Sequence, residues 1–291
     1  MIAALLLLLF GNTQGPAVGW KEGEIWLAQE GSAPVQLTRD GCEKSQPAWS
    51  PDGTKTAYFT NTTVDKPQCP TDVVLLSADG TRLKAIPALD RGNAVVQIDW
   101  LGNDRIGIHT HITPSSGQYR VVDVTTGDEL ASYFGYGFSP SPDSKHIAHA
   151  GGAPHFSPPF AKNDYLMIDD RIVYPRGTDK EPNVRTPDSA DRLLFRDIHQ
   201  FRVDFSWSPD GTQIAFIEKV FEWRAFALGS YYGKEVNDRW WLVVVPAVGA
   251  GAPVQRELPE VGGGVVTMQW TDAGRIQIAG GGISGEYTVT R

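Results

Sequence analysis

One short phrase occurs twice in the chain and limits the folds open to it. Residues 47–60 read PAWSPDGTKTAYFT and residues 205–218 read FSWSPDGTQIAFIE; without gaps, seven of the fourteen positions are identical. Weaker copies of the same unit contain Trp100, Pro140 and Trp270 at the position of the tryptophan. A unit that recurs every 40–50 residues or so is typical of solenoids and propellers.

The phrase itself predicts a β-hairpin. In Ser-Pro-Asp-Gly, proline presets φ, aspartate bonds its own backbone and glycine accepts a left-handed conformation, which together favour a tight turn. Short runs rich in aromatic and β-branched residues follow it, as in Thr56–Phe59 and Ile214–Ile217. Gly23–Thr38 and Asp72–Ile86 each read as a second hairpin. Two hairpins in each unit predict a four-stranded antiparallel blade.

These motifs resemble the WD40-like (PD40-type) repeat of TolB-like proteins. The resemblance rests on Gln36–Thr38, Pro47–Gly53 and Trp207–Gly211. It implies an all-β fold, a β-propeller of four-stranded antiparallel blades that fills residues 18–291 as a single domain. Six blades are favoured. Five remain possible, since residues 155–200 could hold one long insertion instead of a degenerate blade.

The N-terminus predicts export. Ile2–Phe10 is an unbroken apolar stretch of nine residues, and a membrane-spanning helix needs about 20. Its length fits the apolar part of a secretory signal, with cleavage after Ala17. Residues 1–17 are therefore interpreted as a signal peptide. The mature protein is expected to be periplasmic or secreted, without a transmembrane segment.

The two cysteines fit the same compartment. Cys42 and Cys69 are the whole complement of thiols, and an even number in an exported protein permits one disulfide bond. In a propeller blade both would fall on the face that carries the connections between the second and third strands. We therefore expect a Cys42–Cys69 bridge, and no metal site or cofactor.

Charge excludes one class of partner. The chain carries a net charge of −8 with a pI near 5.3, whereas nucleic acids require basic surfaces. We expect no nucleic-acid binding, a monomeric protein, and a protein or peptide partner.

The candidate partner-binding residues lie in the longest connection of the predicted long-loop face, Glu218–Trp241. Aromatic residues crowd this segment together with arginine, a composition typical of interaction hot spots. The alternative is that they pack as a small core of their own. The candidates are Phe221, Trp223, Arg224, Phe226, Tyr231 and Tyr232.

No catalytic constellation is evident in the sequence. Asp169 and Asp170 are adjacent and read as a turn between two strands. Histidines such as His109 and His111 read as hydrogen-bonded side chains more readily than as metal ligands. Chemistry could reside at the mouth of the central channel. The residues expected there are Gln46, Gln97, Tyr136, His199, Arg202 and Asp204.

The sequence thus favours an exported, non-enzymatic propeller that acts as a protein- or peptide-binding scaffold through its long-loop face. The alternative is a propeller enzyme or binder that acts on a small molecule or a carbohydrate at the channel mouth. Propellers host both kinds of function.

Overall fold

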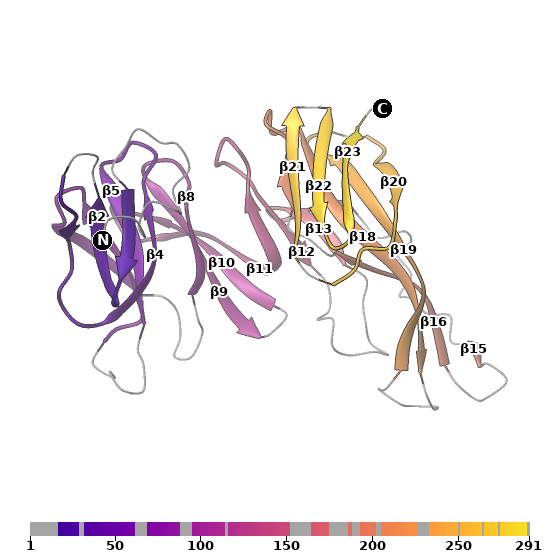
Figure 1. Ribbon diagram of the computed structural model, residues 1–291, viewed down its shortest axis with the longest axis horizontal. Helices are drawn as coiled ribbons and strands as arrows, with labels where there is room; N and C mark the ends of the chain where they lie inside the picture. The colour runs from indigo at the N-terminus through magenta and orange to yellow at the C-terminus, as the bar shows by residue number, and fades with distance from the viewer. Residues whose placement is uncertain are drawn as a thin grey trace. The chain divides into compact units, whose positions relative to one another are not determined.

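The computed structural model describes residues 17–28, 32–61, 69–87, 95–113, 116–151, 164–174, 186–187, 193–201, 205–225, 233–249, 251–263, 265–272 and 274–289. Within these ranges the regular structure is β-strand throughout (Figure 1). No helix long and apolar enough to cross a membrane occurs in them. The chain divides into two compact units, Met1–Ile112 with Gln118–Ser132 and Thr113–Gly117 with Tyr133–Arg291.

Unit 1 contains three groups of antiparallel strands. A three-stranded sheet consists of β1 (Ala17–Lys21), β2 (Glu24–Ala28) and β3 (Val35–Gln36). A four-stranded blade in sequential order consists of β4 (Glu43–Trp49), β5 (Lys55–Asn61), β6 (Asp72–Ser77) and β7 (Arg82–Pro87). The third group is β8 (Val95–Trp100), β9 (Arg105–Thr113), β10 (Ser116–Asp123) and the first part of β11 (Glu129–Pro140).

Unit 2 repeats this plan. The second part of β11 pairs with β12 (Ile147–Gly151), followed by β13 (Tyr165–Ile168) and β14 (Arg171–Tyr174). The next sheet has β15 (Thr186–Pro187), β16 (Leu193–Phe201), β17 (Ser206–Trp207), β18 (Gln213–Ala225), β19 (Gly233–Pro246) and β20 (Val254–Leu258). The last sheet has β21 (Val266–Asp272), β22 (Arg275–Gly280) and β23 (Ile283–Thr288).

The repeated phrase forms the predicted turn. The Ser50 backbone N–H donates to the Lys55 carbonyl (2.8 Å), and the Ser50 hydroxyl donates to Asp52 Oδ1 (2.6 Å), which also accepts the Thr54 N–H (3.0 Å). Gly53 has a φ of 68°, in the left-handed region where glycine carries no Cβ penalty. The expectation that this serine and aspartate form the turn is confirmed.

The second copy repeats these bonds. The Ser208 hydroxyl donates to Asp210 Oδ1 (2.6 Å), which accepts the Thr212 N–H (3.1 Å). In the degraded copy Ser141 bonds Asp143 in the same way (2.7 Å), although Ser144 replaces the glycine and takes a φ of 58°.

In three copies of the unit the tryptophan joins neighbouring sheets, whereas the indole nitrogen of Trp49 has no hydrogen-bond partner among the described residues. The indole N–H of Trp100 donates to the Ala48 carbonyl (3.0 Å), and that of Trp207 donates to the Ser139 carbonyl (3.0 Å). Trp270 repeats the bond to the Ser206 carbonyl (2.9 Å). In each case the acceptor residue directly precedes the corresponding position of the previous copy. The phrase therefore supplies both a turn and a link to the neighbouring sheet.

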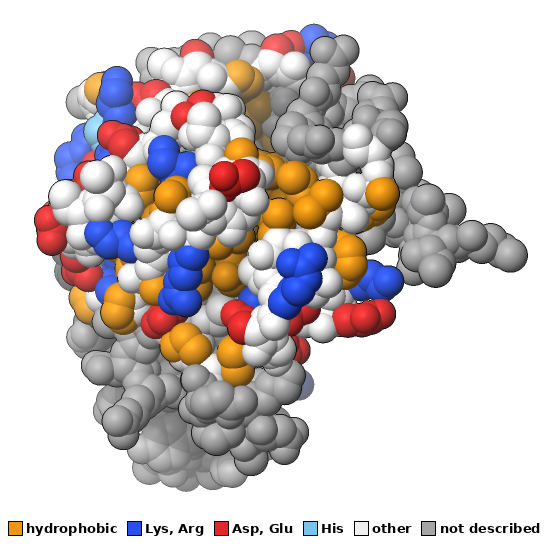
Figure 2. Space-filling view, turned by 90° about the vertical axis from the view of Figure 1, so that its left-hand side faces the viewer, with side chains coloured by type: hydrophobic (Ala, Val, Ile, Leu, Met, Phe, Trp, Pro, Cys, Tyr) orange, Lys and Arg blue, Asp and Glu red, His pale blue; other side chains and the backbone are white. Residues whose placement is uncertain are grey.

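Apolar cores lie within each unit. In unit 1 the sheets β4–β7 and β8–β10 bury a cluster that includes Val73, Leu75, Ile106 and Ile108. In unit 2 one cluster, centred on Phe216 and Val243, lies between the sheets of β12–β14 and β16–β20, and another, including Leu242 and Ile276, lies between β18–β20 and β21–β23. Figure 2 shows further hydrophobic side chains at the surface of the side it views, with acidic and basic ones around them.

The predicted disulfide is present. Cys42 and Cys69 are bonded, with a Cα–Cα distance of 5.6 Å, and both are buried. The fully buried ammonium of Lys44 lies beside the bridge. It donates to the Cys42 carbonyl (2.8 Å), to Glu24 Oε2 (3.1 Å) and to Asp40. The bridge and this ion cluster hold the segment that leads into β4.

Residues 155–200 contribute strands to two different sheets, as far as they are described. β13 and β14 form the outer hairpin of the sheet that begins at β11. Asp169 and Asp170 form its turn, with Asp169 at a φ of 52°, and the Ile147 N–H donates to Asp169 Oδ1 (2.9 Å). The turn predicted at this pair is confirmed. The number of blades stays a prediction.

Candidate functional site

The segment predicted as the longest connection is largely β-structure. β18 and β19 pair from Gln213 opposite Pro246 to Ala225 opposite Gly233, and only residues 226–232 separate the two strands. We call residues 218–225 and 233–241 the arm. β16 pairs with its first strand from Phe201 opposite Glu218 to Leu194 opposite Arg224 (Figure 1). The expectation of an irregular connection from Glu218 onward was wrong. β18 continues to Ala225 because it pairs with β19 on one side and with β16, an earlier strand of the chain, on the other.

A β-bulge interrupts the arm. Val220 lies opposite Arg239, whereas Glu222 lies opposite Val236, so β19 contains one residue more than β18 at this point. Asn237 has a φ of 55°, and its side-chain amide donates to Glu222 Oε2 (2.8 Å). A bulge of this kind redirects side chains and increases the local twist.

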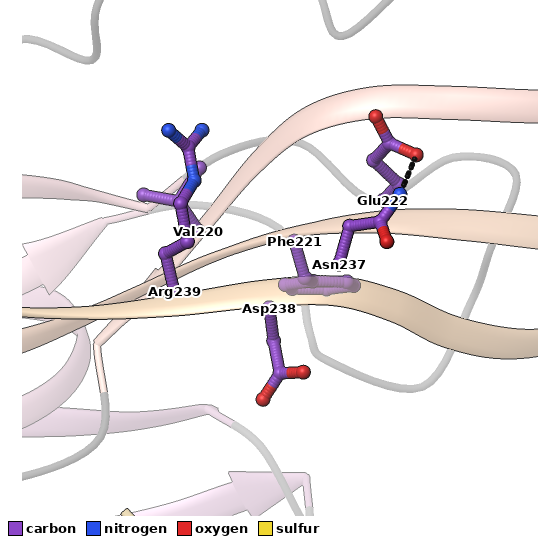
Figure 3. A pocket seen from close by; sticks show the side chains of 6 residues that line it. All are labelled: Val220, Phe221, Glu222, Asn237, Asp238 and Arg239. Atoms are coloured by element: carbon purple, nitrogen blue, oxygen red, sulfur yellow. Dashed lines mark hydrogen bonds between the residues drawn. The ribbon is translucent and has the colours of Figure 1, made fainter. Parts of the chain in front are cut away.

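A pocket of about 270 Å³ lies at the bulge. Figure 3 shows Asp238 pointing to the opposite side of the strands from Val220 and Arg239. Phe221 is 3% exposed and supplies a buried apolar wall. The residues that line the pocket are Val220, Phe221, Glu222, Asn237, Asp238 and Arg239.

The candidate partner-binding residues are only partly placed. Phe221 packs against Ile198 and the half-buried Trp223 in a small cluster of their own, which is the alternative that the sequence left open for this segment. Arg224 is half-buried. Phe226, Tyr231 and Tyr232 lie outside the described residues.

A buried lysine contacts Phe221 and stabilises the arm. The Lys219 ammonium forms an ion pair with Glu235 and lies 5.2 Å from the ring centroids of both Phe221 and Trp240. The Trp240 indole N–H donates to Asp238 Oδ2 (3.1 Å). Cation–π contacts of this kind contribute roughly 0.5–2 kcal/mol each. The arm is thus built from side chains that contact one another.

The residues predicted at the channel mouth fall in both units. Gln46 and Gln97 belong to unit 1, and the Gln97 amide donates to Asp99 Oδ1 (2.6 Å). Tyr136 and His199 belong to unit 2, where Tyr136 packs against the core around Phe216. The side chain of Gln46 and all of Arg202 and Asp204 lie outside the described residues.

His199 contacts a residue that sequence reasoning missed. Its Nδ1 lies 2.8 Å from Glu218 Oε1, and the Glu218 side chain is 1% exposed. The Tyr174 hydroxyl lies 3.2 Å from Glu218 Oε2 and accepts a hydrogen bond from the Gln255 amide (2.9 Å). Burial first, and then the charge of Glu218, raise the pKa of Tyr174 well above its ordinary value. Nothing in the local sequence indicates a role for Glu218. It is the last residue of the repeated phrase, where the first copy has Thr60.

The paired histidines of unit 1 lie close to each other. The rings of His109 and His111 lie 5.7 Å apart, and burial together with the charge of His111 lowers the pKa of His109 to about 4. Neutral His109 is therefore the stable form at neutral pH. Among the residues that the structure places, no group of three or more histidine, cysteine, aspartate and glutamate side chains could hold a metal ion.

Comparison with known proteins gives information on the fold alone. No family model matches the sequence, and no curated protein is similar to it. A hydrazine synthase from Kuenenia stuttgartiensis is similar in structure, with 13% identity over 88% of this chain and 67% of that one and a TM-score of 0.46. An oligogalacturonate lyase in complex with manganese has 14% identity over 67% of this chain and a TM-score of 0.42, and the chain spans half of its length.

Propellers of the expected kinds also occur among the similar structures. A putative TolB from Agrobacterium tumefaciens has 13% identity, covers 81% of this chain and 90% of its own, and has a TM-score of 0.37. The WD40 propeller domain of Doa1 also has a TM-score of 0.37. The all-β class and the four-stranded antiparallel order of β4–β7 are confirmed by the structure, and the similar structures include TolB-like and WD40 propellers. Likeness at this level of identity concerns the fold alone.

Proposed function

We propose that the protein is an exported, non-enzymatic propeller that binds a protein or peptide through the face that carries the arm. The observation that carries this proposal is the arm itself, with a pocket at its bulge. Scaffolds commonly place binding residues on the segments that extend from a regular framework. Interaction hot spots are rich in aromatic and arginine residues, and the arm with its connecting residues has this composition.

The test is affinity purification of the tagged, full-length protein from the cells that export it. One variant replaces residues 226–232 by a short Gly-Ser linker, which leaves the paired strands and Phe221 in place. The control variant is Lys145→Ala, at an exposed turn outside the arm. We expect the linker variant to lose a partner that the control retains. An identical set of partners for all three proteins contradicts the proposal.

We also propose export with removal of residues 1–17, and a monomeric mature protein. The Cys42–Cys69 bond supports an oxidising compartment. Ala17, at the proposed cleavage point, is the first residue of β1 and pairs with Ala28. The intact mass of the protein recovered from the cell envelope or medium would identify its first residue. Light scattering at several concentrations would test the monomer.

One observation favours the second candidate function, action on a small molecule or a carbohydrate. His199 and the buried Glu218 form a pair in which the carboxylate fixes the orientation of the imidazole, an arrangement that suits a general base. Thermal-shift screening against a panel of neutral and acidic oligosaccharides would test it. Stabilisation that His199→Gln abolishes would support this candidate, and the absence of any stabilising sugar would count against it.

A further inference from the structure

One edge of the arm has no strand beside it in the described part of the chain. β20 pairs with β19 only from Trp240 to Val244. From Gly233 to Arg239 the edge of β19 that faces away from β18 has no described partner strand. The backbone groups of an unpaired edge are a template for another extended segment.

The bulge divides this edge into two parts. Gly233–Val236 pairs in regular register with Ala225–Glu222, so its outer backbone groups alternate as in an ordinary edge strand. At Asn237 the positive φ and the extra residue interrupt the pattern. Bulges and charged residues are devices by which proteins prevent long edges from joining one another. The stretch available for pairing is therefore short and ends at a defined residue.

The charges along the arm are unevenly satisfied. Every acidic side chain has a partner within the arm or its neighbouring strand. The pairs are Glu218 with His199, Glu222 with Asn237, Glu235 with Lys219, and Asp238 with Trp240. Lys234 and Arg239 are exposed, and neither forms an ion pair with a described residue. Glu222 and Asp238 accept their hydrogen bonds from neutral donors and keep their negative charge, but Asp238 points to the opposite side of the strands from Arg239 (Figure 3). Lys234 and Arg239 therefore offer positive charge to a segment that adds at this edge.

The pocket lies next to the same edge. Val220 and Phe221 give it buried apolar walls, and the exposed Arg239 lies at its rim. A side chain of an added strand would enter such a pocket while its backbone pairs with the edge. In recognition by strand addition, the backbone hydrogen bonds supply affinity and the side-chain pockets supply specificity.

We propose that the edge Gly233–Val236 binds an acidic peptide segment in extended conformation. The segment adds as a strand to β19, places carboxylates against Lys234 and Arg239, and inserts one apolar side chain beside Phe221. This inference rests on the proposed binding function and names its site and partner class. A second copy of the chain is a poorer occupant, since the bulge interrupts the edge and the net charge of −8 opposes self-association.

The experiment measures fluorescence anisotropy of labelled synthetic peptides with the full-length protein. One peptide alternates glutamate with valine and phenylalanine; its matched counterpart has lysine in place of glutamate. We expect the acidic peptide to bind more tightly than the basic one. The double reversal Lys234→Glu/Arg239→Glu should weaken binding by about tenfold or more, since rim charges act on encounter and specificity. The control Arg39→Glu/Lys145→Glu changes the net charge equally at exposed sites outside the arm and should bind as the wild type does.

Backbone hydrogen exchange locates the peptide. Slower exchange confined to residues 233–236 and their neighbours supports strand addition, and protection elsewhere overturns it. Equal binding of both peptides, or equal loss in the two double variants, also overturns the proposal. A doubled mass in light scattering that disappears in Lys234→Glu/Arg239→Glu would show that a second copy occupies the edge, and would overturn it too. A cellular partner that depends on residues 226–232, without binding of the acidic peptide, would remove this inference and leave the proposed function standing.

Discussion

The hydroxyl of Tyr119 occupies the place of the side chain that Gly107 lacks. An ideal Cβ on Gly107 would lie 1.8 Å from that hydroxyl and 2.2 Å from the ring carbon that bears it. Across the glycine, the hydroxyl donates to Asp99 Oδ2 (2.9 Å), and Tyr119 is fully buried. The glycine is thus required by the close approach of a neighbouring strand's side chain.

Gly107→Ala should destabilise the protein by about 3 kcal/mol, because the added methyl group overpacks the site and displaces the Tyr119–Asp99 hydrogen bond. Urea unfolding followed by far-UV circular dichroism measures the effect. Gly263→Ala is the control, since Gly263 is exposed with no atom near its ideal Cβ; a change below about 0.5 kcal/mol is expected there. Equal stability of the two variants would contradict the role assigned to Gly107.

Trp207→Phe should lower the free energy of unfolding by about 1–2 kcal/mol, because the Ser139 carbonyl loses its hydrogen-bond donor in a partly buried site. Trp49 offers a comparison within the same motif. Its indole nitrogen is buried and has no hydrogen-bond partner among the residues described, so Trp49→Phe removes ring area but no described bond. We expect the denaturant midpoint of Trp49→Phe to fall less than that of Trp207→Phe. The opposite order would contradict a stabilising role for the indole bonds.

Cys42→Ser/Cys69→Ser should lower stability by about 3–4 kcal/mol in the chain-entropy view of a loop this size. The two cysteines are 27 residues apart. Calorimetry of wild type and variant measures the loss, and wild type treated with a reductant should approach the variant. Peptide mapping without reduction supplies an independent check, and free thiols at both positions would disprove the bond.

Acid should weaken two of the hairpin turns, that of the repeated phrase at Asp52 and that between β6 and β7 at Asp79, between about pH 4 and pH 2. Hydrogen bonds from Ser50 and Thr54 lower the pKa of Asp52 from 3.8 to about 2, and bonds from Ser77 and Thr81 do the same for Asp79. A carboxyl whose pKa is lower in the folded state adds stability above its unfolded pKa, which is lost as the pH falls through the folded value. The stability advantage of wild type over Asp52→Asn/Asp79→Asn should therefore shrink over this interval. Carboxyl carbon NMR titration tests the pKa values directly, and values near 4 would remove the basis for the prediction.

The local features of the fold could be predicted from the sequence. Ser-Pro-Asp-Gly encodes its turn in adjacent residues, and the Asp169–Asp170 turn is marked in the same local way. The Cys42–Cys69 bond followed from placing both cysteines on one face of a blade. Each of these rests on information within one repeat or on its alignment with another.

The arm could not be predicted in this way. The aromatic and charged residues after Glu218 have the composition of a connection. They pair with β16, and the alignment of the repeats does not predict this pairing. The bulge at Asn237 lies in the pairing of β18 with β19, and the Glu218–His199 contact depends on the pairing with β16. Phe221, which the sequence offers as a partner-binding residue, is buried for the same reason.

The turn bonds and the indole bonds have very different reach along the chain. Ser50 closes its turn with a residue five positions away, whereas the Trp100, Trp207 and Trp270 donors reach acceptors 52, 68 and 64 positions away. Local hairpins form in roughly 1–10 μs, and contacts between distant residues carry a larger entropic cost and come later. The hairpins of the repeated phrase therefore join residues that are close along the chain, and we expect them to form before the tryptophan bonds that link one sheet to the next.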